Sequence, residues 1–429
     1  MRLLFAASLP LLASCDFTPP TVRINLGTPP NLRWPAAWDQ LTAENIQEIC
    51  TSVSEVYDTY LPGIIGQLVE VIMPRIEHTI PQEYIEEISG LADVVARDCS
   101  DKRLSKNIIE LLNIVYEIEA FDVNAYAGKQ DQYKKEDFDV SEFVDIMKNE
   151  HENLEKVAQT IENFFITFFY NFEAEDPQVN NQKACTSIMA RNNYLGKNFA
   201  ARNMDFNPAG PLRNMIADVI FYETETGTVP LYKGTTFVGY VGLWTSMKTN
   251  AFSITMNQRT YSRLADNLLN ILLAQKMFER TGKDSRIWPI SMKARKTTET
   301  CDTYKCAYNQ MSQATNPAPS YVVMTGMDQD EGALLTKYSR SADIQKVQYQ
   351  SYYPDNDWYL AQTNDDYWLE AGDARRESAH NSMDELGSTN VSIDNLLDVL
   401  DVPPVHAKHT IYSTGMDITT GEYKTVVRT

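Results

Sequence analysis

The sequence predicts an α+β fold in which two packed β-sheets lie between layers of helices, after a largely helical N-terminal part. Apolar residues recur at helical spacing over most of residues 42–121. After Cys185 the pattern changes to short strand-like segments separated by glycine and proline. These segments come in groups, as strands, helices, strands and helices again, which indicates two sheets sandwiched by helices.

The composition indicates a globular protein and argues against nucleic acid as a partner. The chain has 429 residues, of which 43% are hydrophobic and 10% aromatic, so it can bury a large core. Its formal net charge is -20, whereas binding to phosphate needs a basic surface. Self-repulsion decreases as carboxylates protonate near about pH 4, which suits an acidic compartment.

Residues 1–15 have the pattern of a secretory signal peptide. Arg2 is followed by the apolar run Leu3–Ala13, which is too short to span a bilayer, and then by small residues up to Cys15. An alternative interpretation of Leu12–Cys15 is a bacterial lipoprotein box. No later segment has about 18 uninterrupted apolar residues, so we expect a soluble lumenal or secreted protein.

The N-terminal part is expected to be mostly helical. A short strand is predicted at Arg23–Leu26, and prolines interrupt the chain after it. The periodicity then predicts helices over Thr42–Tyr60, Ile64–Ile76, Pro81–Asp98 and Leu104–Phe121.

Residues 122–183 have a different sequence pattern from the predicted helices before them. A charged amphipathic helix is predicted over Val140–Thr160, followed by the aromatic run Ile161–Phe172. This run is interpreted either as a helix packed on the core or as a surface that contacts lipid. Glu173–Lys183 is polar, as a cleavage site before Cys185 would require.

The part after Cys185 is expected to carry most of the strands. A hairpin over Ile188–Met204 comes first, and Ser392 is a candidate N-cap. The other predicted strands are Asp218–Tyr222, Thr235–Trp244, Phe252–Met256, Ser320–Thr325, Gly332–Lys337, Gln345–Tyr349, His409–Thr414 and Tyr423–Arg428, and the predicted helices lie within Leu264–Arg280, Ile287–Met311, Arg375–Leu386 and Ser392–Leu400.

The six cysteines divide into three groups. Cys15 lies at the edge of the signal peptide, and Cys185 is assigned to chemistry. The other four are an even number that suits disulfides, although spacing does not fix their pairing and free buried thiols remain an alternative. They are Cys50, Cys99, Cys301 and Cys306. We expect neither a metal nor a cofactor, because no cysteine or histidine cluster has zinc-ligand spacing.

Cys185 needs a base, because the thiolate is the reactive form and a free thiol has a pKa of about 8.5. None of the five histidines lies in a Cys-His protease signature. An α-amine on the cysteine itself, with a pKa of about 8, would serve as that base. Its neighbours Arg202 and Asp205 return on the second strand of the predicted hairpin.

Several motifs occur together in a fixed order. Over residues 185–429 they are CTSI from Cys185, RNMD from Arg202, GTTFVGYVGLW from Gly234, QTN from Gln362 and Arg375-Arg376; before them come LGTPPNLRW from Leu26 and NIVYE from Asn113. In these motifs and their order the chain resembles the acid ceramidase and N-acylethanolamine acid amidase family.

The resemblance implies an N-terminal nucleophile hydrolase with an αββα core. Such a precursor cuts itself, here between Ala184 and Cys185, into a helical α chain (16–184) and a catalytic β chain (185–429). These two chains would then remain partners. Cys185 would be the nucleophile and its freed amine the base.

The same resemblance implies roles for four further residues. Arg202 would contact the amine or the polar head of the substrate, and Asp205 would orient the cysteine and its amine. Asn364 would donate a hydrogen bond to the oxyanion. Arg375 would position the site by charge-assisted hydrogen bonds.

The chain departs from the family pattern in two places. Gln258 stands where the family has Glu, which removes a charge and makes Gln258 a further candidate site residue. Roughly sixty extra residues lie between the NIVYE motif and Cys185. This insertion, about 122–183, is interpreted as a tolerated surface insertion, an added lipid contact or a second processing region.

The family implies hydrolysis of fatty-acid amides through a thioester acyl-enzyme, with Phe237 and Trp244 as candidates for the acyl groove. N-acylethanolamines such as palmitoylethanolamide are the favoured substrates, and ceramide is the alternative. A third interpretation is an uncleaved lipid-binding relative without turnover. The sequon at Asn390 is consistent with glycosylation on a secretory route, with the lysosome as the expected destination and secretion as the alternative.

Overall fold

The computed structural model describes residues 15–61, 64–122, 139–149, 153–169, 185–224, 226–339, 342–346, 358–369 and 374–429. Residues 1–14 of the predicted signal peptide therefore lie outside the described residues, as do Ala184 and much of the predicted insertion.

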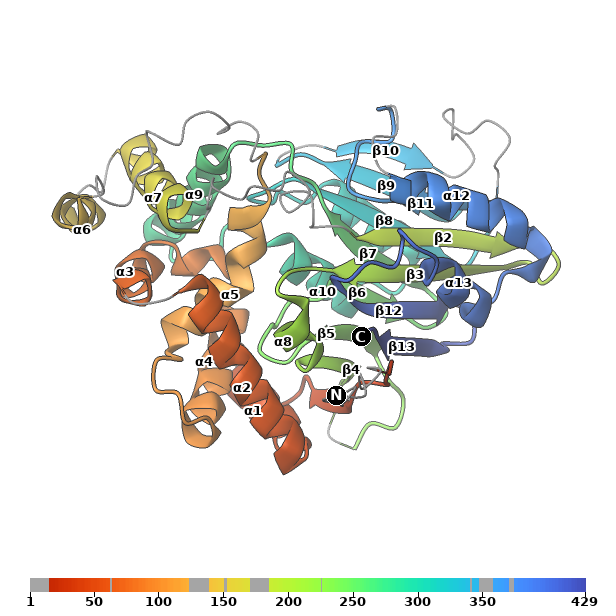
Figure 1. Ribbon diagram of the computed structural model, residues 1–429, viewed down its shortest axis with the longest axis horizontal. Coiled ribbons are helices and arrows are strands. Elements are labelled where there is room, and N and C mark those ends of the chain that lie inside the picture. Colours follow the sequence, from red (N-terminus) through yellow and green to blue (C-terminus); the bar gives the residue numbers. More distant parts are fainter. Residues whose placement is uncertain are drawn as a thin grey trace, which may run out of the picture.

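Two β-sheets form the centre of the molecule (Figure 1). Neighbouring strands are antiparallel except for β1, which pairs in parallel with β4. The eight-stranded sheet has the order β1 (Thr21–Asn25), β4 (Ile216–Tyr222), β5 (Tyr232–Phe237), β6 (Thr245–Lys248), β7 (Phe252–Gln258), β8 (Ser320–Gly326), β9 (Gly332–Lys337) and β10 (Ala342–Lys346). The five-stranded sheet has the order β11 (Tyr359–Gln362), β2 (Thr186–Asn192), β3 (Lys197–Asp205), β12 (Thr410–Asp417) and β13 (Tyr423–Val427).

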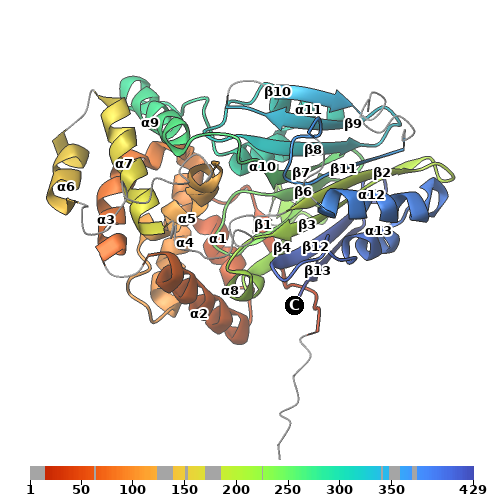
Figure 2. The ribbon, with the colours of Figure 1, turned by 45° about the horizontal axis from the view of Figure 1, so that its top comes forward.

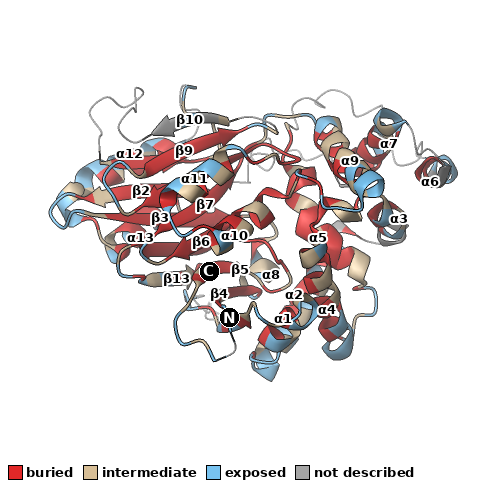
Figure 3. Cartoon of the chain, turned by 180° about the vertical axis from the view of Figure 1, so that it is seen from behind, coloured by how far each residue is buried: buried red, intermediate tan, exposed pale blue. Residues whose placement is uncertain are grey.

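Helices cover the outer face of each sheet. Helices α12 (Ala374–Leu386) and α13 (Ile393–Leu400) lie on the five-stranded sheet, where Ile188, Ala190 and Phe199 pack with their apolar residues. Helices α10 (Ile290–Thr300) and α11 (Tyr304–Ser312) lie on the eight-stranded sheet (Figure 2). Figure 3 shows that the strands between these layers are almost wholly buried. The predicted α+β sandwich with αββα layering is therefore confirmed.

The remaining long helices gather in a lobe at one end of the sandwich (Figure 1). Their amphipathic sequences bury one face each, and α2 and α5 begin at side-chain caps, Thr42 and Ser105. The lobe contains α1 (Pro30–Trp38), α2 (Ala43–Tyr60), α3 (Ile64–Ile72), α4 (Gln82–Asp98), α5 (Lys106–Glu119), α6 (Val140–Asn149), α7 (Leu154–Phe169) and α9 (Leu264–Thr281); the short α8 (Ala209–Arg213) follows β3.

Three predicted elements need correction. Helix α1 was not predicted, since its prolines were interpreted as breaks. It begins at Pro30, because proline is tolerated in the first turn of a helix. The helix predicted over Val140–Thr160 is two helices, α6 and α7. The strand predicted over Thr235–Trp244 is correct only up to Phe237, where β5 ends, and Gly239 then has a φ of 111°, which favours glycine.

Residues 161–169 of the aromatic run before Cys185 belong to helix α7, and residues 170–172 lie outside the described residues. Its residues Ile161, Phe164, Phe165 and Ile166 are buried in the largest core cluster. The interpretation as a helix packed on the core therefore holds for these residues. No helix in the described part of the chain is long and apolar enough to cross a bilayer.

Both predicted disulfides form, and the structure gives their pairing. Cys50 on α2 is bonded to Cys99 at the end of α4, which ties two helices of the lobe together. Cys301 is bonded to Cys306 across the turn between α10 and α11. The alternative of two free buried thiols is thus wrong.

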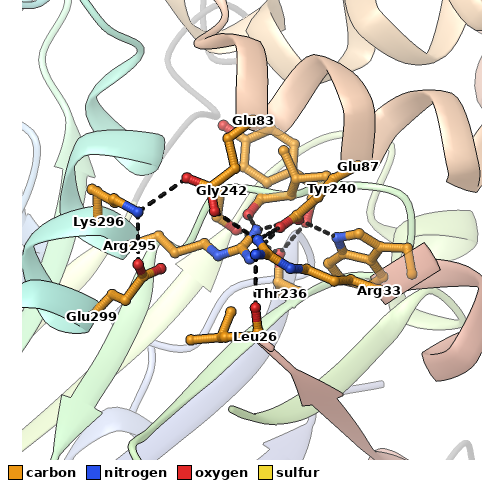
Figure 4. A network of polar contacts seen from close by, with 12 residues as sticks. Leu26, Arg33, Glu83, Glu87, Thr236, Tyr240, Gly242, Arg295, Lys296 and Glu299 are labelled. Atoms are coloured by element: carbon orange, nitrogen blue, oxygen red, sulfur yellow. Dashed lines mark hydrogen bonds and ion pairs between the residues drawn. The ribbon is translucent and has the colours of Figure 1, made fainter. Parts of the chain in front are cut away.

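A buried ion cluster joins the helical lobe to the sandwich (Figure 4). Glu87 on α4 is fully buried and accepts two hydrogen bonds from Arg295 on α10, at 2.6 and 2.8 Å. It accepts two more from Arg33 and the indole of Trp34, at 2.8 and 2.9 Å. Since β1 is also an edge strand of the eight-stranded sheet, segments before and after Cys185 share one core.

We expect Glu87→Gln to lower the free energy of unfolding by about 3–5 kcal/mol, because it leaves buried guanidinium charge without a partner. The matched control is Glu83→Gln, which affects the partly exposed end of the same cluster and should cost no more than about 1 kcal/mol. Denaturant unfolding of the two variants measures the difference. Equal effects would contradict a central role for Glu87.

Candidate active site

The alternation of side chains along a strand places the candidate residues in the layer between the sheets. In β2, Ile188 and Ala190 face the covering helices, so Ser187 and Cys185 face the other sheet. The register pairs Ser187 with Arg202 and Thr186 with Asn203. Cys185, which directly precedes β2, therefore lies beside Arg202 and Met204 on the inner face of the five-stranded sheet.

Three different segments hold Cys185, whose side chain is buried. Its backbone N–H donates to Oδ1 of Asn364 at 2.7 Å. Its carbonyl accepts from Nη1 of Arg375 at 3.2 Å, and its sulfur lies 3.2 Å from Nη2 of Arg202. Both backbone groups and the thiol are thus positioned by side chains from β3, the loop after β11 and helix α12.

Arg202 is fully buried and reaches Cys185 from β3. Its Nη1 donates to the carbonyl of Trp244 at 3.1 Å, to Thr245 Oγ1 at 2.9 Å and to the Tyr412 hydroxyl at 3.3 Å. Burial by itself would lower the pKa of Arg202, but attraction to the Cys185 sulfur and to Tyr412 raises it above the ordinary value. A permanent positive charge therefore lies against the sulfur of Cys185.

Asp205 and Arg375 form a second pair of charged residues beside Cys185. Asp205 is buried at the end of β3, and its Oδ2 lies 3.9 Å from Nη1 of Arg375. The same guanidinium donates to Asn364 Oδ1 at 3.3 Å. Arg375 thus connects the Asp205 carboxylate, the Asn364 amide and the Cys185 carbonyl.

Gln258 ends β7 and lies next to Asn364. The carbonyl of Gln258 accepts from Nδ2 of Asn364 at 2.8 Å. The side-chain Nε2 of Gln258 donates to the carbonyl of Glu119 at the end of α5, at 3.2 Å. All five predicted catalytic residues and Gln258 are therefore close together, although they come from distant parts of the sequence.

A largely apolar cavity extends from Cys185 into the helical lobe. Phe237 and Trp244, the predicted groove residues, both line it, and Tyr116 stacks edge-on against Trp244 with ring centroids 4.5 Å apart. Helices α2, α4, α5 and α7 contribute further apolar side chains, including Val53 and Phe165. The polar lining groups are Cys185, Arg202, Asp205, Glu119, Gln258 and Tyr240.

The sequence did not indicate several residues that support the site. Met204 lies 3.8 Å from the Cys185 sulfur, and strand alternation would have placed it there. Asn257 holds the loop that carries Asn364, since its Nδ2 donates to the carbonyls of Gln362 and Thr363. Tyr412 comes from the last hairpin, and no local pattern links it to Arg202.

Of the histidines in the described residues, His380 contacts Tyr359 and His406 contacts Asp401. His409 lies nearer the cluster, since its carbonyl accepts from the backbone N–H of Phe206 at 3.1 Å, and burial together with the charge of Arg375 lowers its pKa to about 4. No group of three or more His, Cys, Asp or Glu side chains that could hold a metal occurs among the described residues. Asn390, in the sequon, is exposed in the short 3₁₀-helix Ser388–Asn390.

Three buried carboxyl groups favour an acidic environment. Burial raises the pKa of Glu117, on α5, to about 8, and its Oε1 accepts from the backbone of Ile290 at 3.1 Å. Burial also raises the pKa of Glu110 to about 7 and that of Asp218 to about 6. The folded chain therefore binds these protons more tightly than the unfolded chain does.

Comparison with known proteins finds relatives over the whole chain, although no model of a known protein family matches it. The chain is 26% identical to the N-acylethanolamine-hydrolyzing acid amidase of Caenorhabditis elegans over 410 residues, which cover 95% of this chain and 92% of the relative. It is 25% identical to the protein of that name from Rattus norvegicus over 434 residues, 100% of this chain and 94% of the relative.

The chain is also 31% identical to the acid ceramidase of Homo sapiens over 257 residues, which cover 57% of this chain and 62% of that relative. Among solved structures, an N-acylethanolamine-hydrolyzing acid amidase ortholog from Caenorhabditis elegans is 28% identical and covers 55% of this chain and 93% of its own, with a TM-score of 0.46.

Replacing Arg202 by Met should slow alkylation of Cys185 by iodoacetamide about tenfold at about pH 6, because the buried charge beside the sulfur is removed. Peptide mapping by mass spectrometry separates Cys185 from Cys15, which is also outside the two disulfides. Arg191→Met, on β2 but away from the sulfur, is the matched control and should leave the rate unchanged. An unchanged rate in Arg202→Met would contradict the electrostatic role.

Glu117→Gln should flatten the pH dependence of stability. A carboxyl whose pKa rises from about 4.5 unfolded to about 8 folded stabilises the fold at low pH. Its contribution is lost as pH rises through that window, by up to about 1.4 kcal/mol per unit. Urea unfolding at pH values from about 5 to 8 tests this, with exposed Glu48→Gln as the control. A slope as steep in Glu117→Gln as in the wild type would exclude this source.

Proposed function

This chain belongs to the N-acylethanolamine acid amidase and acid ceramidase family, and from this premise we propose that it is a cysteine amidase acting on fatty-acid amides with Cys185 as its nucleophile. The observation that carries the proposal is the position of the Cys185 sulfur, against a buried guanidinium at the polar end of an otherwise apolar cavity. A long acyl chain in this cavity would bring its amide carbonyl to the sulfur.

A cut between Ala184 and Cys185 would prepare the site. Once the signal peptide (1–15) has been removed, this cut would divide the chain into an α chain (16–184) and a β chain (185–429), and it would free the amine of Cys185. The Asn364 oxygen that accepts the Cys185 N–H would remain an acceptor for that amine. The ion cluster of Glu87 and the pairing of β1 with β4 support continued association of the two chains.

In the proposed reaction the freed amine takes the thiol proton, and the sulfur attacks the carbonyl carbon of the substrate amide. The Asn364 amide supports the oxyanion, and Asp205 with Arg375 keeps the amine and the Cys185 carbonyl in position. The protonated amine returns its proton to the leaving nitrogen as the C–N bond breaks. Water then hydrolyses the thioester and releases the fatty acid.

N-acylethanolamines such as palmitoylethanolamide are the proposed substrates. The apolar lining of Phe237, Trp244 and the lobe helices supports an acyl chain, and relatives named N-acylethanolamine-hydrolyzing acid amidase match 95% and 100% of this chain. Ceramide, the substrate class in the name of the human relative, is the alternative.

The proposed location is the lysosome, with secretion as the alternative. The predicted signal peptide, the exposed sequon at Asn390 and two disulfides support a secretory route. The raised pKa values of Glu110, Glu117 and Asp218 support a protein that works at acid pH. Contact with a membrane or lipid vesicle would supply the substrate.

Incubation near pH 4.5 should convert the purified chain into two fragments, one of which begins Cys-Thr-Ser-Ile. It should then hydrolyse palmitoylethanolamide faster than ceramide. Cys185→Ala should stay intact and lose at least about 10³-fold in activity. N-terminal sequencing and release of fatty acid measure the two outcomes.

Two other outcomes of this experiment would contradict the proposal. Faster hydrolysis of ceramide would reassign the substrate. A wild-type chain that stays whole, binds fatty-acid amides and does not hydrolyse them would replace the amidase by an uncleaved lipid-binding protein.

A further inference from the structure

Gln258 presents an unusual acceptor beside the proposed nucleophile. Its side chain is only 5% exposed, and it lines the cavity that contains Cys185. Its Oε1 is buried and has no hydrogen-bond partner in the part of the chain that the structure describes. A buried amide oxygen without a hydrogen-bond partner lowers the stability of a folded protein by about 1–3 kcal/mol.

The orientation of this amide is fixed from two sides. Nε2 donates to the carbonyl of Glu119, so a flip would bring two oxygens together. The backbone carbonyl of Gln258 accepts from Nδ2 of Asn364, whose Oδ1 accepts from the Cys185 N–H. One amide side chain, that of Asn364, therefore bridges Gln258 and Cys185, and both of these residues line the cavity.

A fatty-acid amide brings only one donor to the atoms that react. Its acyl chain has none, and its carbonyl is an acceptor that needs the oxyanion donors. The N–H of the scissile bond is the group that complements an unpaired acceptor there.

We infer that Gln258 Oε1 accepts a hydrogen bond from the N–H of the scissile amide and so selects amides over esters. The inference rests on the proposed amidase function and adds a substrate-contacting residue to it. Because an amide oxygen does not titrate, this contact is the same across the acidic and neutral range.

The contact also has a consequence for bond cleavage. When the sulfur adds to the carbonyl carbon, the nitrogen becomes tetrahedral and gains a lone pair. With its N–H held by Gln258, that lone pair is turned away from Oε1 and is free to take the proton of the Cys185 ammonium. The electrons of the C–N bond then pass to nitrogen, and the neutral amine leaves.

The test compares palmitoylethanolamide with ethylene glycol monopalmitate, the ester in which oxygen replaces the N–H. In Gln258→Met, which keeps the shape and removes the acceptor, kcat/KM for the amide should fall about tenfold. For the ester it should change less than about threefold. Equal losses for the two substrates, or no loss for the amide, would overturn the inference.

Gln258→Glu is the rescuing variant. At about pH 4.5 its protonated carboxyl donates to Glu119 and keeps an acceptor for the substrate, so the amide-to-ester ratio should remain near that of the wild type. A ratio as low as in Gln258→Met would also overturn the inference, even if Gln258→Met itself fails to fold. If the wild type hydrolyses neither substrate, the proposed function fails first, and the inference fails with it.

Discussion

The rest of the structure depends on one buried positive charge, that of Arg202. A guanidinium between two sheets costs several kcal/mol unless partners surround it. Trp244, Thr245 and Tyr412 supply oxygens from both sheets, and the sulfurs of Cys185 and Met204 supply further close contacts. The two sheets therefore fix the position of the Arg202 guanidinium. This guanidinium places a positive charge beside Cys185, just before the first residue of β2.

The helical lobe provides the second requirement, which is an apolar space that ends at that charge. Its helices could not keep such a cavity without rigid attachment to the sheets. The attachment is the carboxylate of Glu87, which accepts four hydrogen bonds and lies between Arg295 of the sandwich and Arg33 of the lobe. A cut before Cys185 is compatible with this arrangement, because none of these contacts depends on residues next to the bond.

From simple periodicities, the sequence predicted the layers and the strand hairpin that returns Arg202 beside Cys185. It missed helix α1, because prolines at Pro30 and Pro35 look like breaks until the first-turn position of Pro30 is known. It could not bring Asn364 and Arg375 to Cys185 by pattern, since these residues are 179 and 190 positions away. Only the resemblance to a family suggested them, and the pairing of the disulfides needed the folded chain.

The central claim is that Cys185 is freed and then forms the acyl-enzyme. The most direct measurement is mass spectrometry of the acid-incubated protein, quenched with acid during turnover of palmitoylethanolamide and then digested. The account predicts one palmitoyl group on the peptide that begins at Cys185, lost on treatment with hydroxylamine as a thioester would be. A palmitoyl group on another residue, or an unmodified Cys185 still joined to Ala184 while substrate is consumed, would contradict it.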